Sequence, residues 1–209
     1  MFDAGTITFQ EFAMREPLPL ATIQNAALEF LRNRDDAVVF GAQAVNAYVG
    51  EARMTQVIDL MSPRAAELAE ELREFLHQEF QIAVRVRTVA GGRGYRVYQV
   101  QKSGNRHLVD LQAVDKLPSA QRIEQVLVMS PAELIASKVI GYAARRGKPK
   151  SGTDWRDIAM LLLTFPELKN ETGAVKERLQ EAGADESVLA VWQELVEQDI
   201  EAEDDDEEF

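Results

Sequence analysis

Two aspartates interrupt apolar segments that otherwise have the composition of β-strands. Asp59 lies within "QVIDLM" (56–61), and Asp110 lies within "RHLVDLQAV" (106–114). Because a lone buried carboxylate is energetically unfavourable, each aspartate must face either solvent or a site that holds a partner. If the two strands are neighbours, Asp59 and Asp110 can converge on a cation; otherwise each is a hydrated residue at a strand end.

Residue 57 shares a strand face with Asp59, about 6.5 to 7 Å away, because side chains two apart on a strand point to the same side. Two carboxylates in that relation, joined by a third from a neighbouring strand, can hold a pair of magnesium ions and the phosphates of a nucleotide. In this chain the residue is Val57, which cannot ligate a metal.

Three further residues have types and positions suited to binding phosphate. Gly41 stands between "AVVF" and a helical pattern, so it either makes a tight turn or lets backbone N–H groups approach a phosphate. Lys138 lies within a helical apolar stripe, so its ammonium either extends past the core or enters a cleft. Arg53 either holds a phosphate or pairs with Glu51.

A basic cluster and two acids follow near the next predicted helix. The cluster suits nucleotide phosphate or RNA, or is the solvated end of a helix; it comprises Arg145, Arg146, Lys148 and Lys150. Asp154 and Asp157 begin the following helix, where acids favour the positive end of the dipole and Asp154 can cap it.

Hydrophobic periodicity places these residues on helices and strands. Strands are predicted at 37–40, 56–61, 82–89, 95–101, 106–114 and 126–129. Helices are predicted at 20–34, from Gly41 onward, and at 63–79, 131–146, 154–164, 172–182 and 186–200. Ser130, Pro131 and Glu133 have the pattern of a capping box. The order predicts an α+β fold with a sheet-containing core at 1–130, a helical subdomain at 131–200 and a disordered acidic tail at 201–209.

Charge and composition narrow the class of protein. The chain has 209 residues and a net charge of −12, but residues 194–209 carry ten acidic and no basic residues, so the rest has a net charge of −2. The tail is either a solvated end or a surface for a basic partner. The absence of cysteine excludes thiolate chemistry, and the absence of a long apolar run or leader pattern predicts a cytoplasmic protein without membrane contact.

Together these residues resemble a known superfamily. "FGAQAVNAYVGEARMTQVIDLMS" is similar to the signature of DNA polymerase β-like nucleotidyltransferases: a Gly-Gly or Gly-Ser helix start, an Arg-x-Thr, and Asp-x-Asp on the next strand. "SPAELIASKVIGYAARRGKPKSGTDWRDIAMLLL" resembles the helical segment of the AbiEii-type toxin branch. The resemblance spans about residues 37–165 and implies a mixed sheet flanked by helices.

The resemblance also implies roles for particular residues. Asp59 and Asp110 would be catalytic and would bind two Mg²⁺ ions, and Asp157 would orient Lys138 or an arginine. The nucleotide or cofactor site would comprise Gly41, Ala42, Arg53, Lys138 and Asp157. The implied activity is transfer of a nucleoside monophosphate from an NTP to a hydroxyl of RNA or protein, as the toxin of a toxin–antitoxin pair with a cognate antitoxin.

The sequence departs from the superfamily pattern at two positions. The first aspartate of Asp-x-Asp aligns with Val57, and the second glycine or serine aligns with Ala42. Losing one of three metal-binding carboxylates removes several kcal/mol of transition-state stabilisation, so we expect weak or no activity. The alternative is an inactive module on the same fold that binds a nucleotide, RNA or a partner protein.

Overall fold

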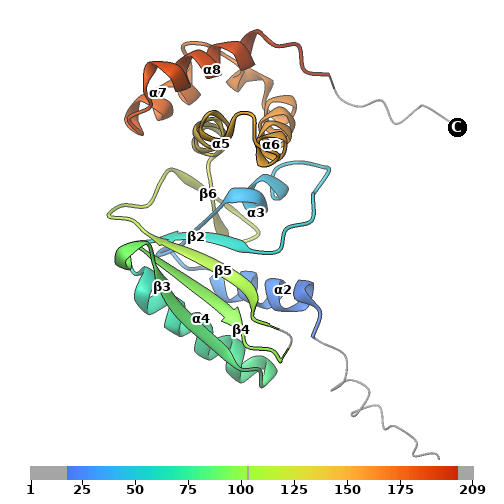
Figure 1. The fold of residues 1–209 in the computed structure, drawn as a ribbon, viewed down its shortest axis with the longest axis vertical. Coiled ribbons are helices and arrows are strands. Elements are labelled where there is room, and N and C mark those ends of the chain that lie inside the picture. Colours follow the sequence, from blue (N-terminus) through green and yellow to red (C-terminus); the bar gives the residue numbers. More distant parts are fainter. Residues whose placement is uncertain (1–17, 103, 202–209) are drawn as a thin grey trace, which may run out of the picture.

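The computed structural model describes residues 18–102 and 104–201, which form a mixed sheet with helices on both sides (Figure 1). The strand order is β3-β4-β5-β2-β1-β7-β6. The strands are β1 (Val38–Phe40), β2 (Ile58–Ser62), β3 (Val84–Val89), β4 (Gly94–Gln99), β5 (Arg106–Ala113), β6 (Ala120–Ile123) and β7 (Val126–Met129). The N-terminal stretch 1–17 and the acidic tail 202–209 lie outside the described residues.

The helices are α2 (Leu20–Leu31), α3 (Gly41–Asn46), α4 (Ala65–Phe80), α5 (Pro131–Arg145), α6 (Lys150–Thr164), α7 (Ala174–Glu181) and α8 (Glu186–Glu197), with short 3₁₀ turns η1 (Ala90–Gly92) and η2 (Pro166–Leu168). The α+β class with a mixed sheet and a helical C-terminal part is confirmed. None of the helices in the described ranges combines the length and the apolar character that crossing a membrane requires.

The centre of the sheet sets the position of the two aspartates. β2 alternates buried and partly buried residues, with Ile58 and Leu60 fully buried on one face. β2 and β5 run parallel, and Asp59 is paired in register with Asp110. Because directly opposed residues share a face of the sheet, both carboxylates project to the side opposite Ile58.

Helices α2 and α4 cover the face of the sheet that carries Ile58 and Leu60. α4 packs against β3, β4 and β5, and α2 packs against α4 (Figure 1). The buried residues of α4 recur at helical spacing: Ala65, Leu68, Ala69, Leu72 and Leu76. Full burial of each larger aliphatic side chain stabilises the fold by about 1.5 to 3 kcal/mol.

The C-terminal helices pack mainly on one another. α5 contacts α6, α7 and α8, and it also contacts α3 beside the sheet. Figure 1 shows these helices gathered at the end of the molecule away from β3 and β4. α5 carries Lys138 toward the part of the sheet where Gly41 and Asp59 lie, so the helical part completes a site that the sheet begins. A domain division at residue 130 stays a prediction.

Four local predictions were wrong. β6 was missed because "AQRI" is a short edge strand with exposed Gln121 and Arg122. The capping box does not form, because the Ser130 side chain makes no cap hydrogen bond and Glu133 instead lies 3.8 Å from Arg178. α4 begins after Pro63, at Ala65. α6 begins at Lys150, so Asp154 lies in its second turn and does not cap it.

Candidate active site

The structure brings most of the predicted site residues around one cleft of about 530 Å³. Asp59 and Asp110 lie at its sheet side, and Lys138 comes from α5. Val57, just before β2, lines the same cleft. The other predicted residues in the lining are Gly41, Ala42 and Arg53.

Gly41 is required by its contact with Asp59. Its backbone has a φ of +69°, which side-chain-bearing residues rarely adopt, and a Cβ at this position would lie 2.3 Å from an Asp59 carboxylate oxygen. The predicted alternatives were a tight turn or a phosphate contact, and the structure shows a third reason: the backbone passes directly over the carboxylate. Since α3 has only six residues, its helix dipole is short.

Asp59 is held in an environment that disfavours its charge. Burial raises the pKa of Asp59 to about 6, and the neighbouring charge of Asp110 adds to this, against smaller opposing effects of Lys138, Lys150 and His107. A carboxylate whose pKa is raised by a like charge is stabilised when a cation joins the pair. The arrangement therefore favours a positively charged ligand at Asp59 and Asp110.

We expect Asp59→Asn to stabilise the fold at neutral pH. The pKa of Asp59 in the folded chain, about 6, lies above the ordinary aspartate value of 3.8, so ionisation makes folding less favourable as pH rises between these values. Removing the charge relieves at most about 3 kcal/mol above pH 6, and nothing at pH 3. Urea unfolding at both pH values measures the difference. Asp115→Asn, at an exposed position, is the control; equal stability of the two variants at pH 7 would contradict the argument.

A buried ion network lies behind the cleft. Asp157 is fully buried, and its two oxygens accept hydrogen bonds from Arg53 Nε at 2.7 Å and from Lys138 Nζ at 2.6 Å. Burial raises the pKa of Asp157, but the hydrogen bonds from Arg53 and Lys138 outweigh it and lower the pKa. Asp157 therefore contacts both Lys138 and an arginine, as the orienting role requires, and it does not itself line the cleft. Arg53 pairs with Asp157 and Glu51 lies near Arg156, so the alternative in which Arg53 pairs with Glu51 is wrong.

The loop before β2 is fixed by hydrogen bonds from α3 and α2. The Asn46 side chain accepts from the backbone N–H of Arg53 at 3.0 Å and donates to its carbonyl at 2.7 Å. Gln24 donates to the Thr55 carbonyl, and the Thr55 hydroxyl donates to the Val57 carbonyl. These contacts hold the loop so that Val57 enters β2 in a fixed register.

The predicted basic cluster divides between two surfaces. Arg145 and Lys150 line the cleft, and Arg145 Nε donates to Asp154 at 2.7 Å. Arg146 instead pairs with Glu194 on α8, and Lys148 is exposed outside the cleft lining. Half of the cluster thus adds positive charge to the side of the cleft that faces α5 and α6.

Two side chains that the sequence patterns did not single out contact Asp110. Arg96 Nε donates to an Asp110 oxygen at 3.1 Å, and His107 Nε2 lies 3.0 Å from the same oxygen. Arginines do occur among the apolar residues of "RVRT" and "GYRVY". That Arg96 contacts Asp110 follows only from the β4–β5 register, which places the two residues opposite each other.

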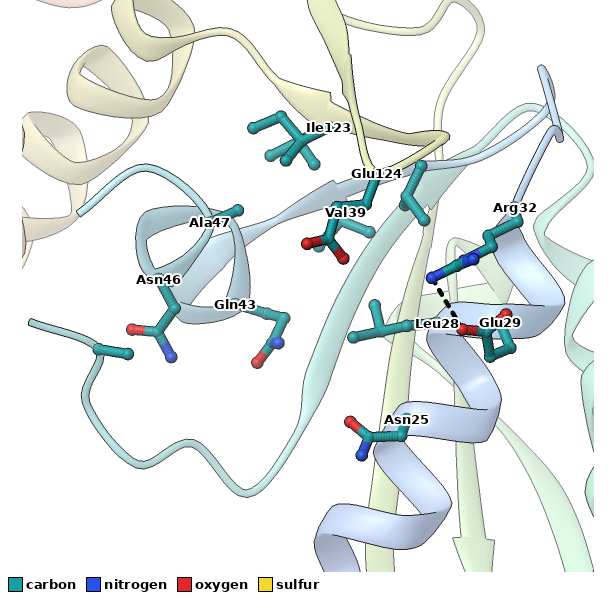
Figure 2. Close-up of a pocket in the computed structure, with 13 residues that line it drawn as sticks. Asn25, Leu28, Glu29, Arg32, Val39, Gln43, Asn46, Ala47, Ile123 and Glu124 are labelled. Carbon is teal, nitrogen blue, oxygen red and sulfur yellow. Dashed lines mark ion pairs between the residues drawn. The ribbon is translucent and has the colours of Figure 1, made fainter. Parts of the chain in front are cut away.

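A second cavity of about 560 Å³ lies on the other side of α3, between that helix, α2 and β7 (Figure 2). Its walls mix aliphatic side chains with amides, and the carboxylate of Glu29 at its rim pairs with Arg32. None of the predicted site residues lines it. The chemistry-bearing groups therefore belong to the cleft at Asp59 and not to this cavity.

The residues of the cleft fit one divalent cation better than two. Asp59 and Asp110 supply adjacent carboxylates, and magnesium is commonly bound by one or two carboxylates together with substrate phosphates. The described residues contain no group of three or more His, Asp or Glu side chains arranged for a metal, and Val57 lines the cleft beside Asp59 without supplying a carboxylate.

Solved structures with this fold support its assignment. The Megavirus polyadenylate synthase matches with a TM-score of 0.57 and 13% identity over 70% of this chain, which spans 32% of that protein's length. JHP933 from Helicobacter pylori matches with a TM-score of 0.54 and 14% identity over 91% of this chain and 90% of its own. Another H. pylori protein, provisionally described as a nucleotidyltransferase, has a TM-score of 0.53 and 12% identity over 85% of this chain and 90% of its own. The chain thus has the nucleotidyltransferase fold.

The sequence gives the family. Residues 26–209 match the profile of the nucleotidyl transferase AbiEii toxin family, described as belonging to a type IV TA system. The chain therefore belongs to the AbiEii family, and the resemblance expected from the sequence is confirmed. No curated protein matches the chain.

Proposed function

We propose that this protein binds an NTP with Mg²⁺ and transfers its nucleoside monophosphate to a hydroxyl of RNA or protein, at a rate reduced by Val57. The observation that carries the proposal is the cleft itself. In the cleft, a pair of carboxylates on β2 and β5 lies opposite a group of cations on α5 and α6, within a nucleotidyltransferase fold.

The cations of the cleft would bind the triphosphate of the NTP. Lys138, Arg145 and Lys150 line the side of the cleft opposite the sheet, where they match the charge of three linked phosphates. Lys138 is held by Asp157, so it needs little ordering when a ligand binds. Lys150 is exposed and can move toward a phosphate.

The carboxylates mark the reacting centre. Asp59 and Asp110 would hold magnesium against the phosphates, and the ion would neutralise charge on the phosphate oxygens during transfer. The acceptor hydroxyl gives up its proton to solvent and its oxygen forms a bond to the α-phosphorus as the bond from that phosphorus to the bridging oxygen breaks, and pyrophosphate leaves. Arg96 and His107 orient Asp110 from the side of β4 and β5.

Val57 also supports a second candidate function, because the position of the third carboxylate is apolar. On this alternative, the chain binds a nucleotide, RNA or partner protein without chemistry. Membership of the AbiEii toxin family makes a cognate antitoxin the expected protein partner under either function.

The proposal is tested by titrating each NTP with Mg²⁺ into the protein by calorimetry and by following labelled nucleotide transfer to RNA and protein. We expect Lys150→Gln to weaken NTP binding about tenfold, since a hydrogen bond to a charged group contributes about 1.5 kcal/mol or more. Lys148→Gln is the matched control, because Lys148 is equally exposed and lies outside the cleft lining. Absence of NTP binding to the unmodified chain would refute nucleotidyl transfer, and it would restrict the second candidate function to binding RNA or a partner protein.

A further inference from the structure

The cavity between α2, α3 and β7 lies on the opposite face of the sheet from the carboxylates of the cleft (Figure 2). Val39 on β1 lines this cavity and is paired with Leu60, whereas the next residue, Phe40, is paired with Asp59 and lines the cleft. Successive strand residues point to opposite faces, so the sheet separates the two spaces. The two linings have no residue in common, so a ligand of this cavity is distinct from the substrate of the cleft.

The cavity has the size and the apolar lining of a small-molecule site. Its volume of about 560 Å³ lies within the range of about 300 to 1,000 Å³ that is typical of such sites. Aliphatic side chains from the sheet, from α2 and from the β6–β7 hairpin form much of the lining: Val39, Val126, Val128, Leu28 and Ile123.

Polar side chains surround this apolar lining. Asn25 on α2, Gln43 on α3 and Glu124 in the β6–β7 turn point into the cavity (Figure 2). Within residues 18–102 and 104–201, these three side chains form no hydrogen bond or ion pair. Their polar groups are therefore available to a ligand.

The turn that carries Glu124 has a strained backbone. Glu124 and Gln125 join β6 to β7 with φ values of +48° and +71°. Two-residue hairpin turns with two positive φ values are usually made of asparagine and glycine. The Gln125 carbonyl accepts hydrogen bonds from the backbone N–H of Asn33 and from the Arg122 guanidinium, both at 2.9 Å, which hold the turn. Since strained residues cluster at binding sites, a held turn that directs Glu124 into a cavity supports a binding role.

The charges of the lining favour a cationic ligand. Glu29 and Arg32 pair with each other at 2.9 Å, so their charges compensate each other. Glu124 adds a carboxylate that no cation in the described part of the chain neutralises. An anionic ligand would be repelled by Glu124, and a purely apolar ligand would remove polar groups from water without replacing their hydrogen bonds. An aliphatic cation suits both the apolar and the polar parts of the lining.

We propose that this cavity binds a small alkylguanidinium ligand, with the guanidinium at Glu124 and the amides and the alkyl chain on the aliphatic side chains. A planar guanidinium can donate two parallel hydrogen bonds to a carboxylate and has further donors for amide oxygens. An ammonium is a compact point charge and would use fewer of these acceptors. Binding at this site does not depend on nucleotidyl transfer at the cleft.

The test is calorimetric titration with butylguanidinium and with butylurea, which has the same shape without the charge. We expect butylguanidinium to bind about tenfold more tightly, because a charged donor strengthens the hydrogen bonds to a carboxylate. Glu124→Gln should weaken butylguanidinium binding about tenfold and leave butylurea binding nearly unchanged. Glu67→Gln is the matched control, because Glu67 is also exposed and forms no ion pair with any described residue, but it lies on α4 outside the cavity.

A pair of variants at Asn25 tests the charge preference without changing the strained turn. Asn25 is exposed on α2, so both variants are expected to fold. Asn25→Asp should tighten butylguanidinium binding about fivefold and Asn25→Lys should weaken it about fivefold.

Several outcomes would overturn the proposal: no binding of butylguanidinium, equal affinity for the two probes, equal effects of Glu124→Gln and Glu67→Gln, or equal affinities of the two Asn25 variants. Tighter binding of a pentapeptide with a central arginine than of butylguanidinium would overturn the assignment to a small molecule and would indicate the arginine side chain of a partner protein.

Discussion

Val57→Asp is expected to raise the rate of nucleotidyl transfer by about a hundredfold or more. A third carboxylate would stand beside Asp59 and Asp110 in the cleft that all three positions line. A gain of about 3 kcal/mol in transition-state stabilisation corresponds to that factor, and completing a two-metal site is worth several kcal/mol. Steady-state transfer of labelled nucleotide at saturating Mg²⁺ measures the effect.

The same change should make the metal-free fold less stable. Asp59 already has its pKa raised by burial and by Asp110, so a further negative charge on this face adds repulsion. Mg²⁺ should then raise the melting temperature of Val57→Asp more than that of the unmodified chain, because binding to the folded state stabilises it. This linkage gives a readout that does not depend on knowing the acceptor.

Val57→Asn separates the charge from the shape. It has nearly the same side-chain size as aspartate but no charge with which to bind a second cation. If Val57→Asn and Val57→Asp transfer nucleotide equally, the missing carboxylate is not what limits the reaction. If Val57→Asp binds NTP without any gain in transfer, the binding-module alternative is favoured.

The carboxylate pair was predictable because strand alternation determines which face a residue occupies. Asp59 is a single charge within a continuous apolar run, and the same is true of Asp110. Their adjacency is a different matter, since α4, β3 and β4 intervene between β2 and β5. The residues alone left that pairing as one of two alternatives, and the resemblance to nucleotidyltransferases favoured it.

The contacts that complete the site could not be predicted from local patterns. Arg53 and Asp157 are 104 positions apart, and their pairing depends on how α6 packs beside the loop before β2. At Ser130 the local pattern was misleading, because Glu133 lies toward Arg178 of α7 and not back toward the helix start. In each case a tertiary contact outweighs a local preference, which is common for short polar motifs.

Asp157→Asn is expected to destabilise the fold by about 3 to 5 kcal/mol, the usual effect of removing one partner from a buried ion pair. Arg53 and Lys138 would be left close together without an anion, with side chains that are only 24% and 12% exposed. Urea unfolding at pH 7 measures the loss. Asp154→Asn is the matched control, because Asp154 is also buried but its partner Arg145 is 34% exposed and can turn to water.

The pH dependence provides a second check on the same network. Because the pKa of Asp157 is lowered in the folded chain, the ionised carboxylate stabilises the fold above the ordinary aspartate range. This contribution is lost as pH falls through the lowered value, so the difference between the unmodified chain and Asp157→Asn should be constant from pH 7 to about pH 5 and shrink below about pH 4. A loss below about 1 kcal/mol at pH 7, or a difference that grows in acid, would show that Asp157 is not the anion that holds Lys138 and Arg53 in place. Ionised Asp59 and ionised Asp157 thus have opposite expected effects on the stability of the fold. The charge of Asp59 destabilises the ligand-free chain and is suited to binding a cation, whereas the charge of Asp157 stabilises the chain by holding Lys138 and Arg53 in place.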